Sequence, residues 1–249
     1  MKKYLLSLSL ILLVIAAAAQ PQFILKGKIE YERKLNVHRQ FEAIMDDDSW
    51  FKEYVTKLPR FYNSYFELTF NNSKTIYQPG KRESEGDPKN TWGVGPAKDN
   101  IVMTDLETQQ VSGYKKVYEA SYLVQDSVRK IEWKLGAETR TIAGFECRKA
   151  VGIICDSVYV VAFYTDEIPV SGGPESFSGL PGMILGLAIP RLYTTWFATK
   201  VELTDPADKD FVINKRAKKI NNKELQATLK ESLEDWGKEG NRNIWWVML

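Results

Sequence analysis

The segment Gly173-Pro174-Glu175-Ser176-Phe177-Ser178-Gly179-Leu180-Pro181-Gly182-Met183-Ile184-Leu185-Gly186-Leu187 places closely spaced glycines and prolines directly before an apolar, strand-like run. Leu180-Pro181-Gly182-Met183 suits a type II turn, because proline presets one central residue and glycine accepts a positive φ at the next. The sequence therefore predicts a sharp reversal that begins a strand over residues 183–189. An alternative interpretation places Phe177, Leu180 and nearby backbone NH groups at a cavity mouth. A phosphate loop is not favoured, because no Lys, Ser or Thr follows Gly182.

Short strand patterns dominate the rest of the chain. Residues 25–37 alternate between apolar and polar side chains, as in a strand with one solvated face. Residues 66–70 and 75–77 form a predicted hairpin around the turn Asn71-Asn72-Ser73. Further strands are expected over residues 101–106, 111–118, 121–124, 128–135, 142–154, 158–165 and 192–203. Their regular spacing predicts an antiparallel meander in a mainly β (α+β) fold.

Two helices and one long loop complete the prediction. Apolar residues recur at helical spacing over 50–58, and Pro59 ends that pattern. A second helix is expected over Lys223–Trp236, capped by Asn221 or Asn222 and ended by Gly237. The tail 244–249 is apolar enough to pack as a final strand or a plug, with contact to a membrane surface as the alternative. Residues 78–98, rich in Gly, Pro and charge, predict a disordered loop or a lid.

The amino terminus has the pattern of a secretory signal. Lys2 and Lys3 precede an apolar run, and small residues follow up to Ala19, so cleavage before Gln20 is expected. The apolar run is shorter than the roughly 20 residues that span a bilayer, and no later segment is apolar enough to do so. Residues 1–19 are therefore a predicted signal peptide and residues 20–249 a single predicted domain.

The charge balance argues against nucleic-acid binding. The formal net charge is +2, and Lys2 and Lys3 account for it, so the mature chain is formally neutral. Binding a nucleic-acid backbone needs a basic face. The candidate residues for such a face, Lys215, Arg216, Lys218, Lys219 and Lys223, lie near Glu224 and are better explained as a solvated surface.

Three ordered blocks carry a family resemblance. They are Ile142-Ala143-Gly144-Phe145-Glu146-Cys147-Arg148-Lys149-Ala150, Phe163-Tyr164-Thr165-Asp166-Glu167-Ile168-Pro169, and Gly173-Pro174-Glu175 with Gly179-Leu180-Pro181-Gly182-Met183-Ile184. The chain resembles the GLPGLI family of exported bacterial proteins, with Met183 in place of the leucine in the namesake motif. This resemblance implies export and carries no catalytic residue. A weaker resemblance to lipoprotein-carrier proteins implies a curved antiparallel half-barrel wrapped around a few helices, including a C-terminal one, and an apolar cavity.

Other chemistries find little support in the sequence. The single histidine, His38, falls at the solvated end of a predicted strand, and one His with two Cys is too few for a tetrahedral zinc site. Asp46-Asp47-Asp48 lacks the glycine and terminal Glu of a calcium loop. A Cys147–Cys155 disulfide needs a turn near Gly152, since one extended strand would separate their Cα atoms by roughly 26 Å; otherwise Cys147 is a small buried residue.

We therefore expect a non-enzymatic cell-envelope protein that binds an apolar or amphipathic ligand or a partner's apolar segment, with no cofactor and no metal. An interaction subunit of an outer-membrane or secretion assembly is the alternative. A hydrolase that uses Asp166, Glu167 and Glu175 is third. Expected location is periplasmic, outer-membrane-associated or extracellular, with possible peripheral membrane contact. The candidate ligand-binding residues are Tyr164, Phe177, Leu180, Met183, Trp196 and Trp236, with Arg148 and Asp166 as polar anchors and Gly179, Leu180, Pro181 and Gly182 as the motif.

Overall fold

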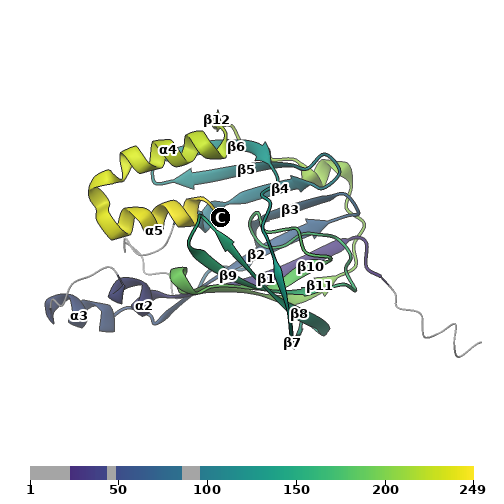
Figure 1. Ribbon diagram of the computed structural model, residues 1–249, viewed down its shortest axis with the longest axis horizontal. Coiled ribbons are helices and arrows are strands. Elements are labelled where there is room, and N and C mark those ends of the chain that lie inside the picture. The colour runs from purple at the N-terminus through teal and green to yellow at the C-terminus, as the bar shows by residue number, and fades with distance from the viewer. Residues whose placement is uncertain (1–22, 44–48, 86–95) are drawn as a thin grey trace, which may run out of the picture.

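A computed structural model describes residues 23–43, 49–85 and 96–249 (Figure 1). The predicted signal peptide, the Asp46–Asp48 run and the middle of the predicted 78–98 loop lie outside the described residues. None of the described helices combines the length and apolar character that a membrane span requires.

The described strands form one curved 12-stranded sheet, which confirms the mainly β prediction. Its spatial order is β12-β6-β5-β4-β3-β2-β1-β11-β10-β9-β8-β7. All neighbouring pairs are antiparallel except β12 with β6. The strands are β1 (Gly27–Asn36), β2 (Phe61–Phe70), β3 (Lys74–Pro79), β4 (Ile101–Asp105), β5 (Gln110–Val117), β6 (Ala120–Ser127), β7 (Lys134–Ile142), β8 (Phe145–Ile154), β9 (Val158–Thr165), β10 (Met183–Ile189), β11 (Thr194–Glu202) and β12 (Lys218–Ile220).

Strand β1 joins two meanders that are far apart in the sequence. It pairs with β2 on one side and with β11 on the other, where Glu32 lies opposite Phe197. The predicted alternation holds, since Ile29, Tyr31 and Leu35 are buried on the core side. Arg33 has the same phase and is buried too, a position that the apolar pattern did not reveal.

The predicted strand 128–135 is wrong over most of its length. Residues 128–133 form an irregular crossover that carries the chain from β6, near one end of the sheet, to β7 at the other end. This segment contains Val128, Ile131 and Trp133, whose side-chain types favour a strand. Residues 128–133 join no strand of the described sheet, and the side chains of Ile131 and Trp133 pack instead against Gly152 of β8.

The described helices are α2 (Val37–Glu42), α3 (Ser49–Thr56), α4 (Asn222–Ser232) and α5 (Gly237–Val247), with 3₁₀ turns η1 (Pro96–Asp99), η2 (Pro190–Leu192), η3 (Asp208–Phe211) and η4 (Glu234–Trp236). The Asn221 cap is confirmed, since its side chain accepts a hydrogen bond from the Glu224 backbone NH at 2.8 Å. The predicted end of this helix is wrong, because it stops at Ser232 and Gly237 begins α5 instead. His38 lies in α2, half-buried, with Nε2 2.9 Å from the Leu58 carbonyl oxygen.

The concave side of the sheet is filled by two segments. Phe177 and Leu180, from the loop between β9 and β10, are buried there beside Trp196. Trp246, in the last turn of α5, and Leu249 pack into the same core, and Figure 1 shows this end of the chain between the β4–β5 region and β9. The predicted packing of residues 244–249 is confirmed, mostly as a helix rather than a strand. A loop and one helix end thus occupy the described part of this side.

Candidate functional site

An open groove crosses one rim of the curved sheet and has a volume of about 480 Å³. We call it the rim groove. Four segments that are distant in sequence line it: the β2–β3 turn, the β4–β5 turn, the crossover after β6, and the loop before β10. Their lining residues are Asn72, Leu106, Gln109, Val128, Arg129, Lys130, Ile131, Pro169, Val170, Ser171, Ser178 and Gly179. The rim groove therefore includes part of the glycine-rich motif that the sequence singled out.

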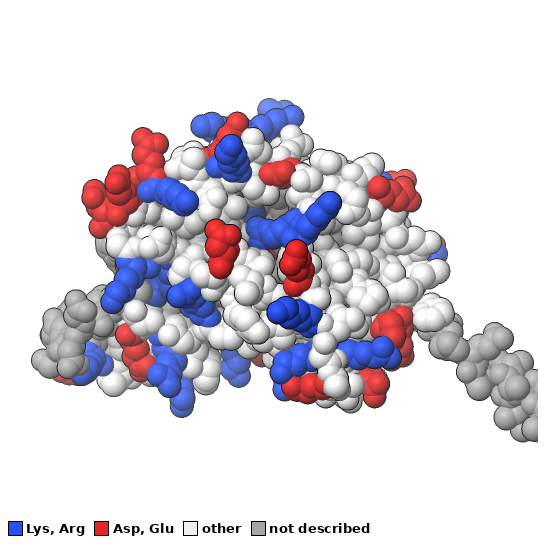
Figure 2. All heavy atoms as spheres, viewed as in Figure 1, with Lys and Arg blue, Asp and Glu red and all other residues white. Residues whose placement is uncertain are grey.

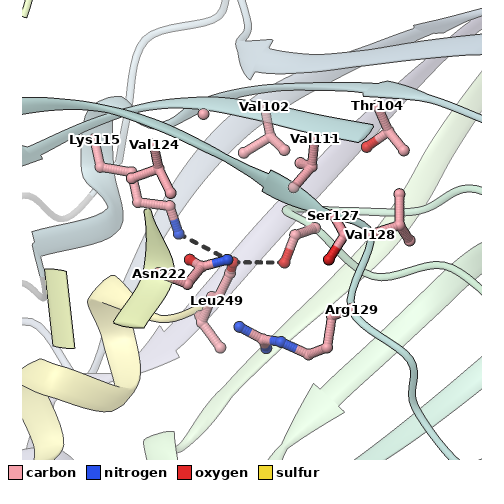
Figure 3. A pocket seen from close by; sticks show the side chains of 12 residues that line it. Val102, Thr104, Val111, Lys115, Val124, Ser127, Val128, Arg129, Asn222 and Leu249 are labelled. Atoms are coloured by element: carbon pink, nitrogen blue, oxygen red, sulfur yellow. Dashed lines mark hydrogen bonds between the residues drawn. The ribbon is translucent and has the colours of Figure 1, made fainter. Parts of the chain in front are cut away.

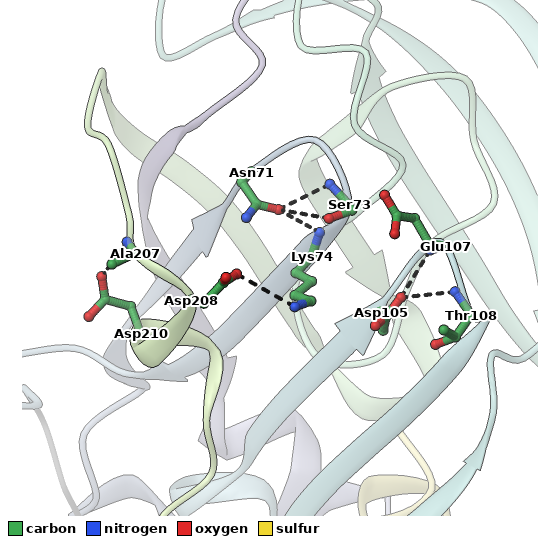
Figure 4. A network of polar contacts seen from close by, with 9 residues as sticks. All are labelled: Asn71, Ser73, Lys74, Asp105, Glu107, Thr108, Ala207, Asp208 and Asp210. Carbon is green, nitrogen blue, oxygen red and sulfur yellow. Dashed lines mark hydrogen bonds and ion pairs between the residues drawn. The ribbon is translucent and has the colours of Figure 1, made fainter.

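Hydrogen bonds fix the two hairpin turns that form one wall of the rim groove (Figure 4). The Asn71 side chain accepts from the backbone NH groups of Ser73 and Lys74 at 3.0 and 2.7 Å. Asp105 does the same for Glu107 and Thr108 at 3.1 and 2.9 Å. These backbone hydrogen bonds hold the pKa of Asp105 below its ordinary value. Such side-chain caps stabilise tight turns and position this wall.

Further backbone hydrogen bonds join the segments that surround the rim groove. The Leu106 NH donates to the Ser73 carbonyl oxygen at 2.7 Å, which ties the two hairpin turns together. The Val128 NH donates to the Gln109 carbonyl oxygen at 2.9 Å, which ties the crossover to the second turn. The groove is therefore built on a connected frame rather than on independent loops.

The opposite wall comes from the loop before β10. Ser171 Oγ accepts a hydrogen bond from the Gly179 NH at 2.8 Å, and Trp133 Nε1 donates to the Ser178 carbonyl oxygen at 2.9 Å. Gly179 has φ of +92°, a conformation that favours glycine. Glycine adopts this conformation without strain, and the two hydrogen bonds hold residues 178–179 at the groove.

The predicted type II turn takes a different form, whereas the predicted strand over residues 183–189 is confirmed as β10. The Gly182 NH donates to the Leu180 carbonyl oxygen at 2.8 Å, a three-residue γ-turn centred on Pro181. Gly182 has φ of +154°, and a Cβ there would lie 2.0 Å from the Thr165 carbonyl oxygen. Close approach of the loop to the end of β9 therefore requires glycine at this position.

A smaller space, the inner pocket, lies on the other side of Arg129 from the rim groove. It measures about 20 Å³, room for about one water molecule. Lys115 Nζ donates to the main-chain oxygens of Val247 and Leu249 at 2.6 and 3.1 Å, and Ser176 Oγ donates to the latter at 2.8 Å (Figure 3). Burial lowers the pKa of Lys115 to about 8. The residues that follow α5 therefore form part of the lining of this pocket and bind its polar side chains.

Two residues that line the rim groove each have a buried polar atom without a hydrogen-bond partner in the described structure. These atoms are Ser178 Oγ and Arg129 Nη1. The other terminal nitrogen of Arg129, Nη2, donates to the Met248 carbonyl oxygen. Burial holds the pKa of Arg129 below its ordinary value. Unpaired buried polar groups are costly and uncommon, so they mark this part of the groove as unusual.

The structure separates the predicted ligand-binding residues into three groups. Tyr164, Phe177, Leu180, Met183 and Trp196 are all buried in the core. Trp236 is 38% exposed and packs against Tyr118, with ring centroids 5.4 Å apart. Arg148 and Asp166 form an exposed ion pair at 3.5 Å. None of the first five lines the rim groove, which adjoins the motif only at Gly179.

A buried polar network was missed by the sequence interpretation. The Arg33 guanidinium donates to Ser64 Oγ and to the Ala97 carbonyl oxygen, each at 2.9 Å, and lies over the Phe66 ring. Glu175, also buried, accepts from Asn100 Nδ2 at 2.8 Å, and burial raises its pKa. The burial of Arg33 could have been predicted from its odd-numbered position in β1, which it shares with the buried Ile29, Tyr31 and Leu35. With its bonds and ring contact, this network serves to hold η1 and the motif loop against the sheet.

Metal and disulfide chemistry are not evident in the described parts of the chain. Nowhere in residues 23–43, 49–85 and 96–249 do three or more His, Cys, Asp or Glu side chains gather as a metal site needs. Cys147 and Cys155 are both free. Gly152 pairs with Val160 within an unbroken β8, so the turn that a disulfide needs does not form there.

A comparison with known protein families gives a match that covers the segment around the motif. A family model described as "Protein of unknown function (Porph_ging)" matches residues 154–186. The match runs from the end of β8 into β10 and includes the Gly179–Met183 motif. The resemblance to the GLPGLI family is compatible with it and stays a prediction. No curated protein matches the chain.

Solved structures share the fold at low identity. Two crystal forms of PNGF-II, in space groups C2 and P21, match with TM-scores of 0.51 and 0.50 and identities of 18% and 17%. The matches cover 79% and 82% of this chain but 31% and 33% of the PNGF-II chains, so the chain spans about a third of their length. An uncharacterised conserved protein from Thermus thermophilus matches with a TM-score of 0.39 at 7% identity, over 78% of this chain and 90% of that one. At these identities the PNGF-II likeness shows the fold alone.

Proposed function

We propose that this protein is a non-enzymatic binding protein of the cell envelope that takes an amphipathic ligand into the rim groove. The observation that carries the proposal is the groove itself, which is lined by apolar side chains and by two residues with unpartnered buried polar atoms. The concave side of the sheet, by contrast, is filled by the protein's own side chains. Binding is therefore assigned to the rim and not to the interior.

The size and lining of the rim groove support this proposal. Its volume of about 480 Å³ falls in the usual range of ligand sites, roughly 300–1,000 Å³. Leu106, Val128, Ile131, Pro169 and Val170 supply apolar surface. Burying about 200 Å² of apolar ligand surface stabilises a complex by about 5 kcal/mol before the costs of association. Such a site suits a ligand bound reversibly.

The placement of the carboxylates favours binding over hydrolysis. Asp166 is exposed and paired with Arg148, whereas Glu175 is buried and bonded to Asn100. The described residues that line the rim groove include no carboxylate, histidine or cysteine. A glycoside hydrolase needs two carboxyl groups facing one bond. A non-catalytic role is therefore the better-supported proposal.

The cell-envelope location is part of the proposal and rests on the predicted signal peptide. Mature protein isolated from the envelope fraction, examined by native mass spectrometry, tests both parts. Retained mass of a small amphipathic compound supports the proposal. Asn72→Trp, at an exposed groove position, should abolish retention, whereas Asn214→Trp, exposed and outside the groove, should not. Equal retention by the two variants would remove the rim groove from consideration.

A second candidate is binding of a polypeptide to the outer face of β8 and β9. Ile153 and Tyr159 lie opposite each other on these strands and are 55% and 52% exposed. They border an open groove of about 420 Å³. Co-purification of one defined polypeptide that is lost in Ile153→Ser, with no small-molecule mass, would favour this candidate over the rim groove.

A further inference from the structure

We infer that the ligand of the rim groove carries an anionic group, attracted by the two cationic residues that line the groove, Arg129 and Lys130. This inference rests on the proposed function and adds the chemical class of the ligand: an apolar body bearing a carboxylate, phosphate or sulfonate. It is argued from the charges that line the groove, from the burial of Arg129 and from the hydroxyl groups nearby.

The ionisable residues lining the rim groove are both cations, Arg129 and Lys130. Nearby carboxylates are engaged or directed elsewhere. Asp105 accepts hydrogen bonds from the turn amides, and Asp126 accepts from the backbone NH groups of Ser127 and Asn222. Glu132 does not line the rim groove; it borders, together with Lys130, the separate groove along β8. On the face seen in Figure 2, positive and negative side chains are interspersed over the molecule. A groove lined by two cations without a carboxylate is thus a local exception.

Arg129 lines both the rim groove and the inner pocket, and it is half-buried. Its Nη1 atom is buried without a hydrogen-bond partner, and the nearby Asp126, whose charge acts on Arg129, is itself bonded to backbone NH groups. Nη2 is bonded only to a neutral carbonyl oxygen, that of Met248. A buried cation without a paired opposite charge is unfavourable, and its field is weakly screened. An anion in the groove would offset this cost.

The neighbouring hydroxyls suit the same kind of group. Ser178 Oγ is buried without a partner, and Ser171 Oγ, which accepts from Gly179, keeps its own proton to donate. Lys130 is exposed, so its ammonium is free to contact a bound group directly. The lining of the rim groove therefore combines cationic and hydroxyl donors with apolar side chains. A ligand whose polar end only accepts hydrogen bonds matches this arrangement.

Two dyes that share one ring system test the inference. Anilinonaphthalene sulfonate carries a sulfonate, whereas N-phenyl-1-naphthylamine lacks it. We expect the sulfonate dye to bind more tightly to the mature protein, with an affinity that falls as salt increases. Lys130→Gln should weaken its binding about 2- to 5-fold and Arg129→Met about 5-fold or more, with little change for the neutral dye. The matched control Lys116→Gln, an exposed change on β5, should alter neither.

Each outcome of this experiment has a definite meaning. One outcome is that Asn72→Trp blocks binding of both dyes, but the mature protein binds the two dyes with equal affinity, and neither salt nor the Lys130→Gln and Arg129→Met changes alter that affinity. The anionic inference is then overturned and the proposed groove function stands. If Asn72→Trp blocks the binding of neither dye, the anionic inference and the proposed function of the rim groove are both overturned. Should Arg129→Met fail to fold, Lys130→Gln and the salt dependence decide, since Lys130 is exposed and outside the core.

Discussion

Gly182→Ala should destabilise the protein far more than an ordinary glycine substitution. The added Cβ would lie 2.0 Å from the Thr165 carbonyl oxygen and 2.8 Å from its carbon, whereas real Cβ contacts stay beyond 3.0 Å. The backbone must therefore move by about 1 Å where Met183 pairs with Thr165. Strain at φ of +154° costs about 1–3 kcal/mol. Loss of the two hydrogen bonds that the Gly182 and Met183 NH groups donate costs about 1 kcal/mol each, so a total of about 3–5 kcal/mol is expected.

Gly144→Ala is the matched control for this prediction. Gly144 also has a positive φ, +90°, but a Cβ there meets nothing within 4 Å. Gly144→Ala therefore lacks the steric clash, and only the cost of placing alanine at a positive φ remains, about 1 kcal/mol. At roughly 2–4 °C per kcal/mol for a chain of this size, Tm should fall by about 10 °C for Gly182→Ala and by about 3 °C for the control. Urea unfolding followed by circular dichroism measures both free energies. Equal losses in the two variants would refute the steric argument.

Three further predictions concern buried polar groups. Burial lowers the pKa of Lys115 from 10.5 to about 8. Between these pH values the unfolded chain binds more protons than the folded protein. The contribution of Lys115 to the free energy of unfolding therefore rises with pH, by up to about 3 kcal/mol. Urea unfolding at pH 7.5 and 10 should show this rise for the wild type relative to Lys115→Met; parallel curves would contradict it. Denatured, unreduced protein should give two free thiols with a thiol reagent, and in the folded state Cys147, whose pKa burial raises to about 12, should react slowly; a missing thiol would point to a disulfide. Ser178→Ala should change stability by less than about 0.5 kcal/mol, because its hydroxyl has no partner, and a loss above about 1 kcal/mol would show that one exists.

Local sequence patterns predicted the strands and helix ends that are determined by interactions between residues close in sequence. The alternation over residues 25–37 predicted β1, and the glycine- and proline-bounded apolar run predicted β10 over Met183–Ile189. Asn221 predicted the start of α4 because its side chain caps a backbone NH three residues away. In each case the deciding interaction lies within a few residues, so it can be seen in the sequence.

The rim groove could not be predicted in this way, because four distant segments build it. Asn72, Leu106, Ile131 and Ser178 meet only after the sheet has curled and the crossover has joined its ends. The aromatic residues chosen as ligand contacts, such as Trp196, pack instead into the core. Aromatic character signals burial, but it does not distinguish the protein's own interior from a site for another molecule.

The pairing of β1 with β11 divides the described sheet into β1–β6, from the first half of the chain, and β7–β11, from the second; β12, from near the end of the chain, adds to the outer edge of β6. Within the sheet, residues 27–127 and 134–202 hydrogen-bond to each other only along this seam, and the crossover 128–133 links them covalently. Contacts between such remote strands are slow to form, so the two meanders should collapse separately before they dock. The protein is therefore a candidate for fragment complementation. Two polypeptides obtained by dividing the chain in the crossover should associate by pairing β1 with β11. Each fragment alone would expose a long unpaired strand edge, which promotes aggregation.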